Sequence, residues 1–170
     1  DDQGAERLIA AAKEHNVPII ADPKLTGLHR THGVDWVLFQ SKGLELMRRR
    51  LGAATGSEAA MMLLENNDWK HLLILEGQDG VTIHSREDET VHVQCMLEEI
   101  RQMIGLIDAA AVAVATAITL DLSVEETAQL ANAASECILI ADRTDRFVLR
   151  LDDMIARIGD IAWSLQVSKR

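Results

Sequence analysis

The sequence predicts a layered α/β/α fold with a mostly parallel sheet, a β-hairpin and a helical C-terminal third. Three observations support this prediction. Helix-like and strand-like segments alternate through the first half of the chain. Apolar runs such as 17–21 and 72–75 are typical of parallel strands that are covered on both faces. Two alternating stretches around 85–89 have the pattern of a hairpin.

Each element has its own signal. Leu8, Ile9 and Ala12 share one helical face, three arginines suit a helix C-terminus at Leu51, and Thr55 with Glu58 has the spacing of a capping box. The expected elements are a helix over 4–16, strands over 17–21 and 35–39, helices over 43–51 and 59–65, a strand over 71–75, and hairpin strands over 80–84 and 90–94.

Everything after Cys95 has helical character. Residues 97–118 form one nearly uninterrupted helical pattern, broken only by Gly105. Ser123 and Glu126 form a second capping box, which predicts a helix toward Ile140. Residues 142–145 break the pattern, and apolar side chains from 151 to 162 predict a final amphipathic helix.

Composition narrows the function. The 170 residues suffice for one domain with its own core, 48% of them are hydrophobic, and the net charge is −10. The negative charge disfavours binding to nucleic acids and to anionic membranes, and the aromatic content of only 3% disfavours stacking on nucleic-acid bases. No apolar run reaches the roughly 20 residues of a membrane span. Cys95 and Cys137 predict buried free thiols in a cytoplasmic protein. Because the chain starts at Asp1, we expect a fragment or a trimmed chain.

Several local motifs occur in a recognisable order. They are Asp1-Asp2-Gln3-Gly4, Ile20-Ala21-Asp22-Pro23-Lys24, Glu76-Gly77-Gln78-Asp79-Gly80, Gly105-Leu106-Ile107-Asp108, and the helix from Ser123 through Ala134. Over residues 1–142 the chain resembles the C-terminal half of the ribokinase (PfkB) family of carbohydrate kinases, and especially the heptose-7-phosphate kinase branch. The resemblance implies a ribokinase-like, nucleotide-side half over 1–145 and a C-terminal strand and helix extension over 146–170.

The resemblance also implies roles for particular residues. Asp108 stands where the family has the base that deprotonates a sugar hydroxyl, and Gly105 stands where its phosphate cradle begins. Gly77 and Gly80 correspond to a nucleotide-lining turn, and Asn132 corresponds to a residue near adenine. ATP, Mg²⁺ and a sugar are therefore the implied ligands, and no metal-ligating residue is assigned. The residue-level alternatives are a helix-surface aspartate, an ordinary turn and a helix-surface amide.

The chain departs from the family pattern around this site. In the family motif D-x-T-G-A-G-D, the first Asp, the Thr, the Ala and the second Gly are replaced by Gln102, Ile104, Leu106 and Ile107. The family also has an N-x-x-E motif, whose carboxylate is absent from residues 40–43 of this chain, and Leu75 stands where the family has a threonine before the turn at 76–80. A helix that runs continuously through Gly105 would satisfy its own N–H groups and leave none for phosphate. We therefore expect that the helix N-terminus of the anion hole is erased.

These departures favour a degenerate, non-catalytic domain with a structural, regulatory or assembly role and no cofactor. The alternative is an ATP-dependent sugar kinase, or the nucleotide-binding half of one. If the chain is the natural product, the missing half of the family fold should leave a sheet edge or face uncovered, which predicts a homo-oligomer or a partner chain that completes the sheet. The segment 22–24 either faces a substrate or simply ends a strand. His29 with His32, and His84 with His92, lack a third metal ligand.

Overall fold

The computed structural model describes the chain except for residues 1, 88, 143–148, 162–164 and 170. The described chain forms two compact units, Asp1–Ile74 with His84–Glu89 and Leu75–Ile83 with Thr90–Arg170. Hydrogen bonds link the six strands of the described residues in the order β1-β2-β3-β4-β5-β6. The predicted α/β class is confirmed. The predicted division near residue 145 lies outside the described residues.

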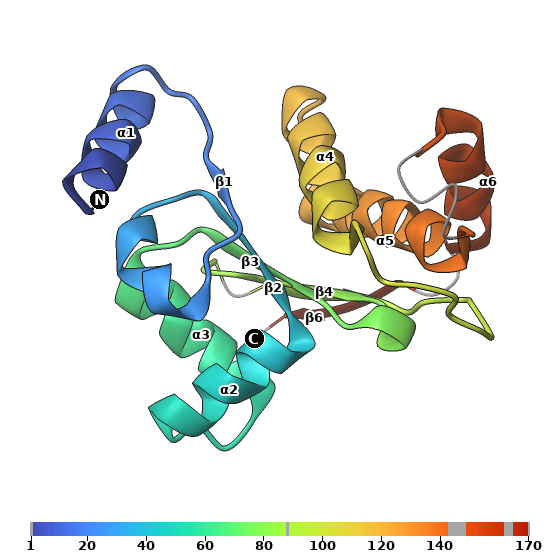
Figure 1. Ribbon diagram of the computed structural model, residues 1–170, viewed down its shortest axis with the longest axis horizontal. Coiled ribbons are helices and arrows are strands. Elements are labelled where there is room, and N and C mark those ends of the chain that lie inside the picture. The colour runs from blue at the N-terminus through green and yellow to red at the C-terminus, as the bar shows by residue number, and fades with distance from the viewer. Residues whose placement is uncertain (1, 88, 143–148, 162–164, 170) are drawn as a thin grey trace. The chain divides into compact units, whose positions relative to one another are not determined.

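The first unit contains the helices and strands of the N-terminal half (Figure 1). Its elements are α1 (Asp2–Glu14), β1 (Ile20–Ala21), the 3₁₀ helix η1 (Leu25–Thr31), β2 (Trp36–Gln40), α2 (Ser41–Leu51), α3 (Gly56–Asn67) and most of β3 (His71–Leu75). β1 runs parallel to β2, with Ile20 opposite Trp36. β1 is shorter than predicted, and η1 was not expected.

The core of the first unit lies between the strands and helices α2 and α3. Alternate residues of β2 and β3, among them Phe39 and Ile74, enter this core, as the period-2 geometry of strands requires. Trp69 is fully buried there, packs edge-on against Phe39, and donates its Nε1–H to the carbonyl of Thr31 at 2.8 Å. That hydrogen bond satisfies the single polar atom of the indole and fixes the end of η1.

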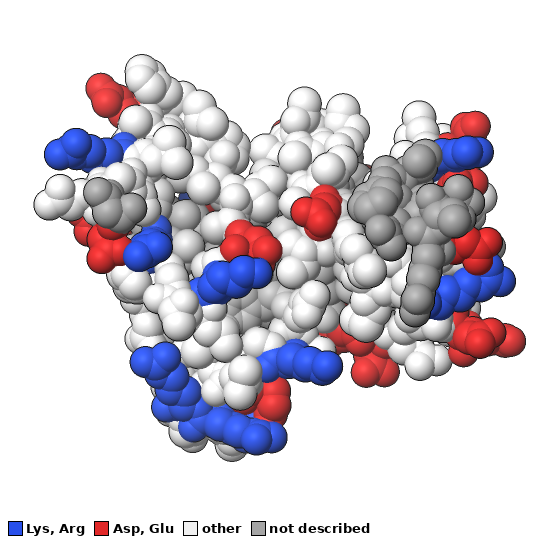
Figure 2. All heavy atoms as spheres, in the orientation of Figure 1, with Lys and Arg blue, Asp and Glu red and all other residues white. Residues whose placement is uncertain are grey.

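Capping explains the boundaries of α2 and α3. Thr55 accepts a hydrogen bond from the amide of Glu58, and the Glu58 carboxylate accepts one from Ala54. α2 ends at Gly52, which adopts a left-handed conformation. Arg48 donates to the Ala53 carbonyl just beyond that end. Figure 2 shows a concentration of basic side chains over α2, where Arg48 and Arg49 hold the pKa of Glu45 down at about 2.

The second unit is built on packed helices (Figure 1). Its elements are η2 (Gly77–Asp79), the start of β4 (Val81–Ser85), β5 (Glu89–Val93), α4 (Leu106–Thr119), α5 (Val124–Ile140), α6 (Leu151–Ile161) and β6 (Leu165–Lys169). α4 and α5 contact each other, and alanines such as Ala113 and Ala131 are the commonest buried residues of both helices, which favours close packing. The capping box of Ser123 and Glu126 is formed as predicted.

One prediction about this unit is wrong. Residues 94–104, which we call the entry segment, are not helical, and α4 begins only at Leu106. The reason is Gly105, whose φ of 87° and ψ of 4° place it in the left-handed region, where a right-handed helix cannot continue. The expectation of a helix through Gly105 therefore fails, and with it the argument that the N-terminus of α4 is erased.

Candidate active site

The N-terminus of α4 carries the two residues with the most specific predicted roles. Gly105 occupies the cap position without a side-chain cap, and the first intrahelical bond runs from the amide of Ala109 to its carbonyl, at 2.9 Å. The first-turn amides therefore lack intrahelical acceptors and produce the positive end of the helix dipole. Asp108 lies exposed in that first turn. Gly105 and Asp108 thus share one turn in which the amides of Ile107 and Asp108 lack intrahelical acceptors, while the amide of Leu106 donates to the carbonyl of Met103 at 3.4 Å.

The bulky residues that replace the small ones of the family motif are accommodated differently from expectation. Leu106 is 1% exposed, so its side chain belongs to the core of the unit and does not cover the helix end. Ile107 is half-buried and lies within the helix, where its φ is not positive. Ile104, just before the turn, is exposed. The backbone thus forms a helix start at Leu106 although the side chains differ from those of the family motif.

The entry segment is attached to the C-terminal end of α5. The amide of Arg101 donates to the carbonyl of Leu139 at 2.8 Å, and the side chain of Gln102 donates to the carbonyl of Ile138 at 2.6 Å. The last carbonyls of a helix lack intrahelical partners. The bond from Arg101 gives the carbonyl of Leu139 a partner outside the helix, and the bond from Gln102 adds a second donor to the carbonyl of Ile138, which also accepts from the amide of Ala141 at 3.3 Å. The path into α4 is consequently set by the end of α5 (Figure 1).

A second attachment holds the start of the entry segment. Glu136 of α5 is completely buried, and its Oε1 accepts hydrogen bonds from the amide of Met96 at 2.7 Å and from Asn132 Nδ2 at 3.1 Å. Arg157 of α6 brings its Nη1 within 3.8 Å of the other carboxylate oxygen. Burial raises the pKa of the neighbouring Cys95 thiol, and the Glu136 carboxylate raises it further.

Asn132 belongs to this buried cluster. It is 1% exposed, so the alternative of a helix-surface amide is wrong. Its Nδ2 donates to the carbonyl of Gln94 as well as to Glu136, while its Oδ1 has no hydrogen-bond partner among the described residues. Both known partners of the Asn132 amide belong to the protein, so its role visible here is to hold the entry segment. Contact with an adenine stays a prediction.

Gly77 and Gly80 form the turn before β4, as predicted. Both have positive φ values, 64° and 101°, and the amide of Glu76 closes the turn by donating to the carbonyl of Gly80. The side chains of Met103 and Ile100 lie over Gly77. Gly80 passes so close to the backbone after β5 that a side chain would overlap it. Packing within the unit accounts for both glycines, and nucleotide contact stays a prediction.

The histidine pairs do not form metal sites in the described structure. His92 lies 2.9 Å from the hydroxyl of Thr82 and 3.6 Å from the carboxylate of Glu76, while His29 contacts Asp2 at 3.2 Å. His32 contacts the carbonyl of Asn67. Among the residues that the structure describes, no three His, Cys, Asp or Glu side chains gather closely enough to hold a metal ion.

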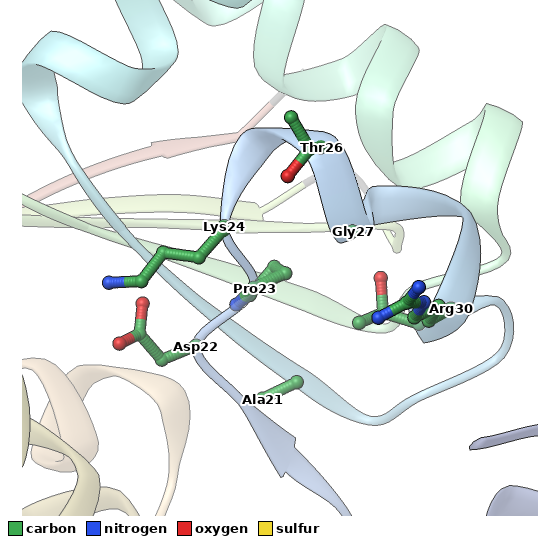
Figure 3. A pocket seen from close by; sticks show the side chains of 8 residues that line it. Ala21, Asp22, Pro23, Lys24, Thr26, Gly27 and Arg30 are labelled. Atoms are coloured by element: carbon green, nitrogen blue, oxygen red, sulfur yellow. The ribbon is translucent and has the colours of Figure 1, made fainter. Parts of the chain in front are cut away.

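A pocket of about 480 Å³ lies in the first unit, at the carboxyl end of β1. Figure 3 shows the side chains that line it, with the carboxylate of Asp22 and the ammonium group of Lys24 at one end and Arg30 at the other. Arg30 donates its Nε–H to Asp2 of α1 at 2.6 Å, which lowers the pKa of that carboxyl group. In open α/β sheets, ligands bind beyond the carboxyl ends of strands, so this is the expected position of a ligand site.

Sequence reasoning missed several residues that shape these sites. Gln102 was noted only as a departure from the motif, and its bond to Ile138 spans 36 residues, which no local pattern reveals. Glu136 looked like one more charged residue of a helix. A charge inside an otherwise apolar stretch, between Ser135 and Cys137, was the available signal that it is buried. Arg30 lies in η1, which was not predicted.

Residues 1–144 match the pfkB family of carbohydrate kinases. The chain belongs to this family. Two curated relatives are both named "Bifunctional protein HldE": the one from Shewanella piezotolerans is 26% identical over 135 residues, and the one from Vibrio parahaemolyticus is 26% identical over 132 residues. Each alignment covers 77% of this chain and 28% of the relative. The chain thus spans less than a third of these relatives.

Solved structures of two kinases share the fold. Phosphofructokinase-2 from Escherichia coli, crystallised in complex with substrates and products, aligns with a TM-score of 0.78 at 18% identity, over 95% of this chain and 53% of that one. Ribokinase from Thermotoga maritima aligns with a TM-score of 0.73 at 18% identity, over 89% and 52%. The chain corresponds to about half of each kinase. At these identities, the likeness shows the ribokinase-like fold alone.

None of the helices in the described ranges is both long and apolar enough to cross a lipid bilayer.

Proposed function

We propose that this chain is the nucleotide-side half of an ATP-dependent carbohydrate kinase, which transfers a phosphoryl group to a hydroxyl of a sugar or sugar phosphate. The observation that carries the proposal is the start of α4. Gly105 follows the entry segment in a left-handed conformation, and no side chain caps the first-turn amides of α4. Uncapped helix N-termini are favourable positions for phosphate groups.

Asp108 is the proposed base. Its carboxylate is exposed in the first turn of α4, where it can reach an incoming hydroxyl group beside a phosphate held by the backbone. Removal of the hydroxyl proton by a positioned carboxylate assists attack on the phosphorus atom. Bound Mg-ATP would supply the γ-phosphoryl group. The amides of the helix start would stabilise the negative charge on its oxygens, since they are already oriented before the reaction.

The pocket at the carboxyl end of β1 supports a phosphorylated ligand. Lys24 and Arg30 provide an ammonium and a guanidinium group on a chain whose net charge is −10. Thr26 adds a hydroxyl donor, and Asp22 offers an acceptor for ligand hydroxyls. Cationic and hydroxyl donors next to a carboxylate suit a molecule that carries both phosphate and hydroxyl groups. The predicted position of residues 22–24 facing a substrate is consistent with this lining.

A second candidate is the non-catalytic domain that the motif departures favour. Its specific support is the loss of polar side chains around the helix start. An isoleucine stands in place of the motif threonine at 104, and the thioether end of Met103 lies over Gly77. In this case the chain has a structural, regulatory or assembly role and binds no nucleotide. Pairing of the sheet edge with a second copy or a partner chain would fit that role.

Nucleotide binding separates the two candidates. In a thermal unfolding experiment with the 170-residue chain, a kinase half should be stabilised by Mg-ATP and much less by adenosine, because the helix start recognises phosphates. Saturation at 100 times Kd adds about 2.7 kcal/mol to the free energy of unfolding. Absence of stabilisation at millimolar Mg-ATP would contradict the kinase proposal and favour the non-catalytic domain.

A further inference from the structure

We propose that Gln102 is a positioning residue that holds the entry segment and Gly105 in the geometry from which α4 starts. The inference deepens the proposed function, since the helix start is the proposed phosphate site. It rests on that function only for its nucleotide readout. Gln102 stands where the family motif has an aspartate, so the sequence alone indicates the loss of a motif residue.

The side-chain amide of Gln102 makes a hydrogen bond with each of its two ends. Its Nε2 donates to the carbonyl of Ile138 at 2.6 Å, and its Oε1 accepts from the amide of Ile104 at 2.9 Å. The residue is only 8% exposed, so water cannot readily replace either partner. One side chain therefore connects the end of α5 to the backbone immediately before Gly105.

Only a side chain with both a donor and an acceptor can make these two bonds. An ionised carboxylate accepts hydrogen bonds but donates none. An aspartate or glutamate at 102 could still receive the amide of Ile104, but it would place an oxygen against the carbonyl oxygen of Ile138. The arrangement of this chain thus requires an amide, which gives a physical reason for the glutamine. Glutamine in place of the motif aspartate therefore stabilises the helix start through a different set of hydrogen bonds.

The bond from Ile104 to Gln102 spans two residues and sets the direction of the chain at the turn. Gly105 follows directly and takes its left-handed conformation, after which the amides of 106–108 are oriented by the helix. The amides of Arg101 and Gln102 also donate to the carbonyl of Leu139, at 2.8 and 3.4 Å, so four hydrogen bonds hold the segment on the N-terminal side of Gly105. Loss of the Gln102 amide would leave the position of the first turn less well defined.

The test compares Gln102→Glu, which replaces the donor by a charged carboxylate oxygen and keeps the acceptor, with Gln102→Leu, which removes donor and acceptor without adding charge. Thr31→Val is the matched control. It removes one buried hydroxyl, which donates to the carbonyl of Leu28 at 2.7 Å, from the first unit. Amide hydrogen exchange is measured by NMR across residues 101–109 in all four proteins. The affinities for Mg-ATP and adenosine are measured by calorimetry.

Gln102→Glu loses the bond to Ile138 but keeps the acceptor for the amide of Ile104. We expect it to speed exchange of Arg101 and Ile104 about tenfold by loosening the segment that carries them, and Gln102→Leu, which also frees the amide of Ile104, to speed exchange further. Thr31→Val should leave these amides unchanged. The Gln102 variants should also weaken Mg-ATP binding several-fold while leaving adenosine binding unaffected, which a loss of overall stability would not do.

Two results would overturn the inference. Exchange at 101–109 could be the same in the wild-type chain and both Gln102 variants, or it could change equally in Thr31→Val. If the wild-type chain binds no Mg-ATP, the proposed function fails, but the exchange data still decide whether Gln102 positions the helix start. If the wild type binds Mg-ATP and the Gln102 variants bind it equally well, the kinase proposal stands and the positioning role is contradicted.

Discussion

Gly80→Ala is the substitution whose effect the structure determines most directly. Gly80 has φ 101° and ψ −139°, a conformation that residues with a side chain rarely adopt. A Cβ atom there would lie 2.7 Å from the amide nitrogen of Cys95 and would overlap the carbonyl oxygen of Val93. Both contacts are with backbone at and just beyond the end of β5. The clash therefore cannot be relieved by a side-chain rotation.

Two contributions set the size of the effect. A backbone held in a sparsely populated region costs about 1–3 kcal/mol, and forcing an extra methyl group into a packed interior costs about 1–3 kcal/mol more. Together they predict a loss of about 2–6 kcal/mol. Because domains of this kind are stable by only about 5–15 kcal/mol, the variant should be marginally folded or unfolded at 25 °C.

The assay is equilibrium unfolding in urea, with Gly52→Ala as the matched control. Gly52 also has a positive φ, 71°, but a Cβ atom there would meet no atom within 4 Å. The control thus isolates the conformational cost, about 1 kcal/mol. Gly80→Ala should lower the urea midpoint far more than Gly52→Ala. Equal shifts in the two variants would refute the reasoning that close backbone approach explains Gly80.

Three further predictions concern charge and capping. Burial lowers the pKa of His71 from its usual 6.5 to about 4, so between pH 6.5 and pH 4 the unfolded chain binds a proton that the folded chain does not. The free energy of unfolding should therefore fall by about 2 kcal/mol from pH 7 to pH 5, and in urea unfolding the His71→Gln variant should lack that part of the pH dependence. Arg157→Ala should lower the free energy of unfolding by about 2 kcal/mol, because it leaves the buried carboxylate of Glu136 without a nearby cation. Adding Glu136→Gln should recover part of this loss, and a double variant no more stable than Arg157→Ala would contradict the pairing. Ser123→Ala should cost about 1 kcal/mol through loss of the α5 cap, measured by thermal unfolding, and an unchanged midpoint would argue against it.

Local signals predicted most of the helices and strands. The caps at Thr55 and Ser123 were visible because a capping box lies within four residues of sequence. The hairpin and the buried strand at 71–75 followed from patterns of equally short range. These elements depend on interactions between neighbours in sequence, which is why they could be found without a structure.

The start of α4 could not be predicted in the same way. Helix propensity treats Gly105 as a weak point inside a helix, whereas the structure uses it as the left-handed residue that separates two segments. Together with the left-handed conformation of Gly105, hydrogen bonds to Glu136, Ile138 and Leu139, some 36 to 40 residues later, keep residues 94–104 from joining the helix. Such tertiary contacts override local propensity, and they altered the functional expectation together with the fold.

The most direct test of the account is phosphoryl transfer, compared between the wild type and Asp108→Asn. The transfer of the γ-phosphate of ATP to a sugar or sugar phosphate is measured alongside the Kd of Mg-ATP. The account predicts transfer by the wild type, its loss in Asp108→Asn, and an unchanged Kd, because the amides of the α4 start, and not the carboxylate, hold the phosphates. Transfer at an unchanged rate in Asp108→Asn would contradict the account.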